Sequence, residues 1–228
     1  LAVNDRTVQR FVAGLDGKVS LFGSDWRWNA YYQQGESESL EIAKDITNNA
    51  RLALAQDAVF RPGTTQIVCR STLTDPGNGC VPLNRMGVGV VTNDALAYVL
   101  GNPQREQTLE QRVAAISING EPFSVAAGPV SLATGIEWRE EEVTGFVDPI
   151  YRSGWFVGNY LPNFGKYDVK EAFVETVVPL AAGKPMAEAL DLNAAVRRTD
   201  YSTSGAVTTW KVGGIWAPVR DIRFRATR

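Results

Sequence analysis

Residues 187–202 read AEALDLNAAVRRTDYS and decide the fold, because apolar and polar side chains alternate along them. In an extended chain, Leu190 and Leu192 lie on one side, whereas Asp191 and Asn193 lie on the other. A period of two residues is typical of a β-strand with one apolar and one polar face. This stretch therefore predicts a strand of a two-faced antiparallel sheet.

The same alternation recurs along most of the chain. It predicts an all-β fold with small helical insertions, in which about eight strands form an antiparallel up-and-down meander. The expected strands are 7–17, 26–35, 109–119, 129–141, 168–180, 187–202, 206–217 and 220–228.

The links between these strands differ in length. Links one, three, five and seven are short, and the first is a turn over residues 22–25, whereas links two and four are the insertions 36–108 and 143–167. In an antiparallel meander all odd links leave one end of the sheet. The insertion 36–108 is expected to hold a helix over 39–57, with Ile42, Ile46 and Leu54 on its apolar stripe, and a short helix running from an Asn93 cap to Gly101.

Cys69 and Cys80 bracket a loop rich in turn-forming residues. A pair this close predicts a local disulfide, which the loop-entropy model values at roughly 3 kcal/mol and which implies an oxidising compartment. Two free thiols are the alternative, and two ligands alone do not make a structural zinc site.

Composition excludes several classes of protein. The 228 residues include 23 basic and 25 acidic ones, and this balance disfavours a nucleic-acid binder. The sequence has no histidine, which removes Ser-His-Asp and Cys-His catalysis. No stretch reaches the roughly 20 apolar residues of a membrane-spanning helix. We therefore expect no enzyme activity, no metal and no cofactor.

Short turns at one end and long loops at the other are typical of outer-membrane β-barrels. The expected strands are long, and tryptophans lie near strand ends at Trp26, Trp138, Trp210 and Trp216, as in an interfacial aromatic girdle. A soluble sheet with one solvated face alternates in the same way. In a barrel, the polar side would face the lumen and include Glu171, Glu175, Asp191, Asn193, Arg197, Arg223 and Arg225.

Several segments resemble a known family. Residues 167–180, 190–202, 210–213 and 221–228 resemble barrel strands of TonB-dependent outer-membrane receptors. The segment 69–84 resembles a disulfide-closed extracellular loop of that family, and 120–130 resembles a periplasmic turn.

The resemblance implies that residues 1–228 are an internal piece of such a barrel in the bacterial outer membrane, without its plug domain or terminal strands. It implies uptake of a scarce nutrient such as a ferric siderophore, cobalamin or an oligosaccharide. Energy would come from the TonB complex through the plug. Membrane lipid or lipopolysaccharide would surround the barrel, and an isolated piece would oligomerise through unpaired edge strands. Loop contacts to the nutrient are expected from Tyr151, Trp155, Phe156, Tyr160 and Phe164.

Three charged groups have competing interpretations. Glu140–Glu142 predict a solvated strand end or a site for divalent cations that bridge lipopolysaccharide. Glu171 and Glu175 share a face as glycosidase carboxylates do, although lumen polarity is the simpler interpretation. Arg223, Arg225 and Arg228 would attract anionic solutes or pair with acids such as Asp191. The rival functions are accordingly a secreted soluble β-sandwich or small barrel that binds ligands, and a carboxylate-based hydrolase.

Overall fold

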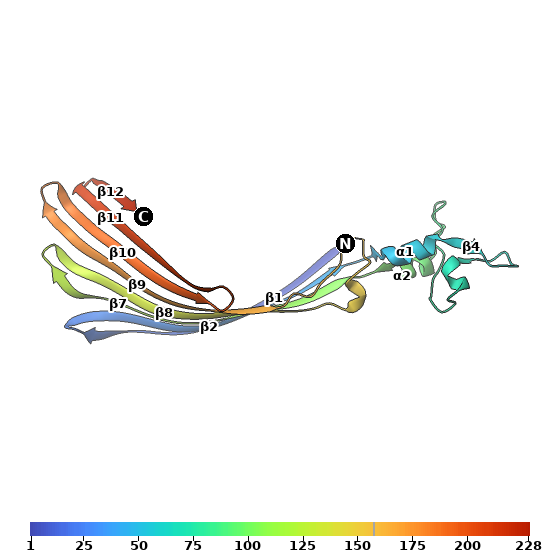
Figure 1. Ribbon diagram of the computed structural model, residues 1–228, viewed down its shortest axis with the longest axis horizontal. Coiled ribbons are helices and arrows are strands. Elements are labelled where there is room, and N and C mark those ends of the chain that lie inside the picture. Colours follow the sequence, from blue (N-terminus) through green and yellow to red (C-terminus); the bar gives the residue numbers. More distant parts are fainter. Residues whose placement is uncertain (157) are drawn as a thin grey trace. The chain divides into compact units, whose positions relative to one another are not determined.

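The computed structural model describes residues 1–156 and 158–228, and its main feature is one eight-stranded antiparallel sheet (Figure 1). The strand order is β1-β2-β7-β8-β9-β10-β11-β12, so strands consecutive in the sheet follow each other along the chain apart from the insertion after β2. The predicted meander of about eight strands is confirmed. Among the described residues β1 and β12 do not pair with each other, so the sheet is open.

Most strands are longer than the alternation predicted, whereas β10 and β12 are slightly shorter. Their bounds are β1 Ala2–Leu21, β2 Ser24–Ala43, β7 Gln104–Val125, β8 Gly128–Phe146, β9 Gly165–Lys184, β10 Ala187–Tyr201, β11 Gly205–Val219 and β12 Ile222–Thr227. As predicted, the odd-numbered links between strands are all short, and the two long insertions are even-numbered links. Each odd link is a two-residue turn, and Gly23 in the first of them has a φ of 77°, which suits glycine.

The insertion after β2 carries the smaller elements. These are β3 Ile46–Thr47, α1 Asn49–Gln56, β4 Ala58–Phe60, β5 Ile67–Cys69, the 3-10 helix Arg70–Leu73, α2 Asn93–Val99 and β6 Leu100–Gly101. A second 3-10 helix, Pro149–Tyr151, follows β8. In the described part of the chain, no helix is long and apolar enough to cross a membrane.

The predicted helix over 39–57 is wrong in its first half. Residues 39–43 continue β2, where the Ser39 hydroxyl donates to the Gln107 carbonyl and Arg105 pairs with Glu41 at 2.6 Å. The helix begins only after Asn48, whose side chain accepts a hydrogen bond from Arg51 N at 3.1 Å. The second helix is present as α2, but its N-cap is Thr92 rather than Asn93, and it ends at Val99 rather than Gly101 because Leu100–Gly101 form β6.

The chain divides into two compact units. Unit 1 comprises Leu1–Thr7, Ser37–Thr108 and Val143–Phe164, whereas unit 2 comprises Val8–Glu36, Leu109–Glu142 and Gly165–Arg228.

Both insertions contribute to unit 1 and pack on each other there. Trp155, from the second insertion, is 5% exposed and forms a bridge with Asn48 of the first. Its ring lies so close to Gly101 that a Cβ at this glycine would overlap it. The predicted disulfide between Cys69 and Cys80 is confirmed, and it lies within this unit.

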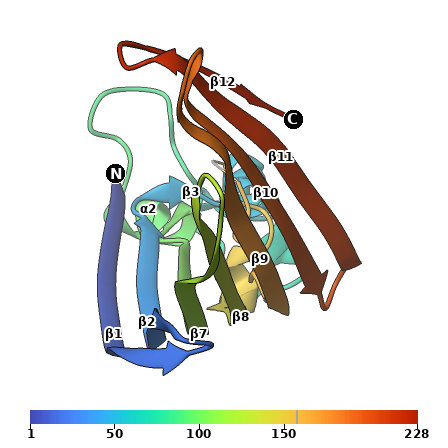
Figure 2. The same ribbon diagram turned by 90° about the vertical axis from the view of Figure 1, so that its left-hand side faces the viewer.

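Unit 2 consists almost entirely of the sheet. Strands β9, β10 and β11 lie side by side (Figure 2). Val174 of β9 lies opposite Val196 of β10, which in turn lies opposite Trp210 of β11. Directly opposed residues of antiparallel strands point to the same side. Between the register shifts at Leu190/Asp191 and at Trp216/Val219, even-numbered residues of β9–β12 therefore share the apolar face and odd-numbered ones the polar face.

Candidate functional site

The polar face carries the residues predicted to line a lumen. Glu171 accepts a hydrogen bond from Thr199 at 2.9 Å and pairs with Arg197 at 3.1 Å. Asp191 lies in one row with Ile215 and Arg225. No ion pair joins Asp191 to Arg223 or Arg225 among the described residues, so the expected pairing is replaced by the one between Glu171 and Arg197.

Glu175 lies apart from that ion pair, although it is on the same face. It lines a groove of about 580 Å³ together with Lys18, Arg27, Asn119 and Glu121. Asn193 also points to this side of the sheet, with its amide oxygen toward Gly213. The two carboxylates Glu171 and Glu175 thus have different surroundings.

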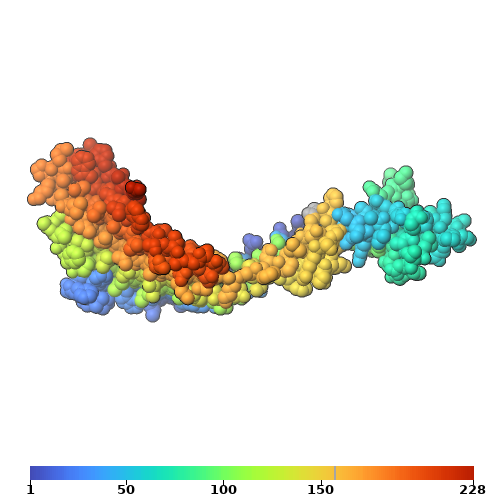
Figure 3. Space-filling view, viewed as in Figure 1, coloured from blue at the N-terminus to red at the C-terminus, as the bar shows by residue number. Residues whose placement is uncertain are grey.

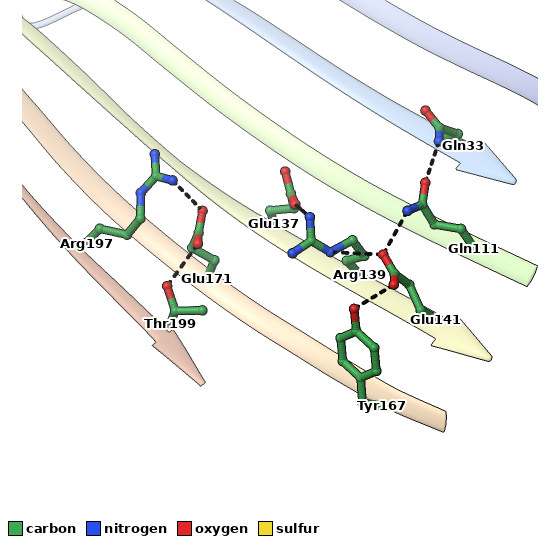
Figure 4. Close-up of polar contacts among 9 residues, drawn as sticks. All are labelled: Gln33, Gln111, Glu137, Arg139, Glu141, Tyr167, Glu171, Arg197 and Thr199. Carbon is green, nitrogen blue, oxygen red and sulfur yellow. Dashed lines mark hydrogen bonds and ion pairs between the residues drawn. The ribbon is translucent and has the colours of Figure 1, made fainter. Parts of the chain in front are cut away.

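A chain of hydrogen bonds crosses five neighbouring strands on the polar face, and Figure 4 shows its part from Gln33 to Tyr167. Arg10 donates to Gln33, whose amide donates to Gln111 Oε1 at 3.0 Å. Gln111 donates in turn to Glu141 Oε1 at 2.9 Å, and the Tyr167 hydroxyl donates to Glu141 Oε2 at 2.6 Å. We call Arg10, Gln33, Gln111, Glu141 and Tyr167 the polar chain.

These contacts shift two pKa values. The Tyr167 hydroxyl, then Gln111 and the charge of Arg139, lower the pKa of Glu141 against the opposing effect of burial. The hydrogen bond to Glu141, followed by burial and by the negative charge of Glu141, raises the pKa of Tyr167. Near neutral pH the carboxylate is therefore ionised and the phenol is protonated, as their hydrogen bond requires.

Sequence reasoning missed the polar chain. Each of its residues occupies an unremarkable polar position, and only the pairing of strands far apart in sequence brings Gln33 to Gln111. Alternation within 109–119 is the one signal that could have placed Gln111 on the polar side.

The run Glu140–Glu142 is not a strand end, because β8 continues to Phe146. Alternation places Glu141 on the polar face but Glu140 and Glu142 on the other, so the run does not converge on one cation. Glu140 lies 3.5 Å from Arg112 and 3.1 Å from Lys166, and Lys166 lies 3.4 Å from Glu142. Glu140 is also the main cause of the raised pKa of Lys166.

These residues form a charged row at the border of the apolar face. We define it as Glu110, Arg112, Glu140, Glu142 and Lys166, drawn from β7, β8 and β9. On the same face, the next residue after Arg112 along β7 is Ala114, and the next residue before Glu140 along β8 is Trp138. The face therefore changes from charged to apolar within two residues of the charged row.

Strands β10–β12 form the orange to red part of the surface in Figure 3, and they carry large exposed apolar side chains. Trp210 is 62% exposed and Phe224 is 55% exposed. We call this surface the apolar belt. It comprises the half-buried Leu190 and the exposed residues Leu192, Val196, Trp210, Val212, Trp216, Ile222 and Phe224.

The aromatic residues predicted to contact a nutrient have different environments in unit 1. Trp155 is a core residue whose indole donates to the Ile150 carbonyl, and Tyr151 packs against it with ring centroids 5.5 Å apart. Tyr160 lies under the Arg105 guanidinium. Phe156 and Phe164 are largely exposed and accessible to a ligand.

The comparisons with known proteins place no constraint on these sites. No protein-family model matches this chain, and no curated protein or solved structure does so.

Proposed function

We propose that the sheet is part of a transmembrane β-barrel, and that the protein acts as an outer-membrane receptor of the TonB-dependent type that takes up a scarce nutrient. The observation that carries this proposal is the apolar belt. Its large side chains are contiguous and, apart from the half-buried Leu190, exposed, whereas soluble proteins rarely leave such patches uncovered. Lipid is the solvent that such a face requires.

The extent of the belt supports the proposal. On β11 it runs from Trp216 to Trp210, which is roughly 20 Å of extended strand. Transmembrane barrels have an apolar band about 25 Å tall, with aromatic residues at both of its borders. Trp210 and Trp216 occupy the two ends of the belt, as residues of such girdles do.

The strand lengths fit the same interpretation. β7 and β9 have 22 and 20 residues, more than the roughly 10 that a tilted strand needs to cross the hydrocarbon. The charged row marks where β7, β8 and β9 leave the apolar layer. Beyond it, the strands continue toward the long links, and the link between β2 and β7 carries the disulfide.

In this proposal the polar face lines the lumen and the nutrient passes the polar chain. First contact is made by exposed aromatic residues of the long links, Phe156 and Phe164. The TonB complex supplies the energy through a plug domain, and no covalent bond of the nutrient changes. The bacterial outer membrane is the corresponding location.

The test is contact between Trp210 and lipid acyl chains. The whole polypeptide is reconstituted in phosphatidylcholine bilayers with and without bromine atoms on the acyl chains, which quench nearby indoles. We expect quenching that falls markedly in Trp210→Phe. The matched control is Trp155→Phe, which removes an indole buried in unit 1 and should leave the quenched component unchanged.

A secreted soluble binder gives a different result. It would remain in buffer after extraction without detergent, and brominated lipid would leave its fluorescence unchanged. That outcome would replace the transport proposal with the soluble one.

A further inference from the structure

The dipeptide Asn-Gly occurs twice in the chain, in two different structural settings. Asn78 and Gly79 lie in the loop that the disulfide closes, immediately before Cys80. Asn119 and Gly120 lie inside β7. Because glycine has no side chain to hinder it, the peptide nitrogen that follows asparagine can attack the carbonyl carbon of the asparagine side chain. The two settings decide whether this attack can take place.

The side chain of Asn78 is folded toward the residues that follow it. Its amide oxygen accepts a hydrogen bond from Cys80 N at 2.9 Å, and this bond closes a ring that contains the Gly79 nitrogen. The Gly79 amide makes no hydrogen bond of its own with the described residues, and Gly79 is exposed. The attacking nitrogen is therefore accessible to base, and it belongs to the same ring as the carbon that it attacks.

The setting of Asn119 and Gly120 opposes the same attack. Strand β7 has β2 on one side and β8 on the other, so its amides are engaged in the hydrogen bonds of the sheet. The indole of Trp26 lies so close to Gly120 that a Cβ there would overlap it. Ring closure requires the backbone at Asn119 to rotate out of its extended conformation, which the neighbouring strands and this packing prevent.

We propose that Asn78 is a site of spontaneous deamidation in the folded protein. The Gly79 N–H gives its proton to hydroxide, the nitrogen forms a bond to Asn78 Cγ, and the bond from Cγ to Nδ2 breaks as ammonia leaves with a proton from water. Water then opens the resulting succinimide at either carbonyl carbon, which yields aspartate or isoaspartate. Negative charge develops on the side-chain oxygen during the attack, and the N–H of Cys80 stabilises this charge.

Deamidation changes the charge of the loop. A carboxylate at position 78 adds a negative charge near Asp75, whose side chain accepts a hydrogen bond from Gly77 N in the same turn. Isoaspartate also adds one backbone carbon to the loop between the two cysteines. The loop therefore becomes more acidic as the protein ages. The inference concerns the chemistry of this loop and does not depend on the proposed transport function.

The test follows both asparagines in one sample of the whole folded polypeptide held at pH 8. Samples are reduced and digested with trypsin, and mass spectrometry with fragment ions assigns each deamidation to its residue. We expect Asn78 to deamidate at least ten times faster than Asn119, because the sheet must open locally before Asn119 can react. In concentrated urea the two rates should agree within a factor of three, because glycine follows both residues and neither is held by the fold.

Two glycine variants test the route of the reaction. Gly79→Ala should slow deamidation of Asn78 at least tenfold, because the added methyl group hinders the attacking nitrogen, and a Cβ there meets nothing within 4 Å. Gly79 has a φ of 69°, so the variant is also measured in urea, where the same slowing is expected without backbone strain.

The matched control is Gly77→Ala, two residues earlier in the same turn, where a Cβ makes only ordinary contact with Asp75. This variant should keep the parent rate at Asn78. Equal rates at Asn78 and Asn119 in the folded protein, or an unchanged rate in Gly79→Ala, would overturn the proposal.

Discussion

Glu141 is the residue at which the polar chain converges, since it accepts from both Gln111 and Tyr167. Its carboxylate lies beyond the apolar belt, next to members of the charged row. Hydrogen bonds to a charged acceptor are stronger than those between neutral groups. The geometry of the polar chain therefore depends on the ionisation of this one side chain.

We expect Tyr167→Phe to lower the free energy of unfolding by about 1 to 2 kcal/mol at pH 7, because it removes the main hydrogen bond to Glu141. The pKa of Glu141 is lower in the folded state than its ordinary value of 4.5. This contribution is therefore fully present above that value and is lost as the pH falls through the folded pKa. Urea denaturation between pH 7 and pH 2 should show the two proteins converging in acid.

Tyr32→Phe is the control, because the Tyr32 hydroxyl makes no hydrogen bond with the described residues. Its effect should be small and independent of pH. An effect of Tyr167→Phe that is equally large at pH 2 and pH 7 would contradict the role given to Glu141.

At the level of elements, the disulfide constrains the loop between β5 and the segment that returns to α1. Leu83 N donates to the Ala55 carbonyl at 2.9 Å just after Cys80, so the covalent link holds this return segment against the helix. Cys69 itself is fully buried.

Replacing both cysteines by serine should cost roughly 3 kcal/mol, because the open chain regains loop entropy when it unfolds. Hydrogen exchange should accelerate for amides of α1 and β5 in unit 1. Amides of β9, β10 and β11 in unit 2 serve as the internal reference and should keep their rates. Equal acceleration in both units would contradict a local role for the bond.

Alternation predicted the number and order of the strands but not their ends. Residues 104–108 of β7 lack a clear apolar period, and cross-strand contacts such as Arg105 with Glu41 hold them extended. Ile42 and Ile46 lie four residues apart, a spacing that a helix and an extended chain both permit, so the helix over 39–57 was predicted too early. In both segments the secondary structure depends on contacts with residues distant in the sequence, which alternation does not reveal.

The candidate site was predictable to a similar degree. The polar side of β9 and β10 follows from alternation alone, which places Glu171 and Arg197 on one face once the register is known. The different environments of the aromatics at 151–164 did not follow from the sequence. Burial of Trp155 depends on the space at Gly101, a glycine more than fifty residues earlier.

At the scale of the whole molecule, the environment of the apolar belt is tested by placing a charge in it. Val212 lies between Trp210 and Trp216 on the apolar side of β11. We expect Val212→Arg to cost about 2 to 4 kcal/mol for folding into lipid vesicles, because the guanidinium enters hydrocarbon. Denaturant titration of vesicle-bound protein measures this change.

Lys211→Arg, one residue away on the polar face, is the matched control and should change stability little. In a soluble protein, Val212→Arg replaces an exposed valine and stays within about 0.5 kcal/mol of the parent. A near-neutral result in vesicles would count against lipid contact at β11.

The bridge between Asn48 and Trp155 determines which parts of the chain must be present before the core of unit 1 can form. The two residues are separated by about a hundred positions, and β7 and β8 lie between them in the chain. The core of unit 1 therefore cannot close until both of these strands have been synthesised and the segment after β8 has returned. Contacts of such long sequence separation slow folding, because loop entropy is lost before they form. During that interval the surfaces around Asn48 and α1 remain uncovered, and transiently exposed apolar surface of this kind favours aggregation.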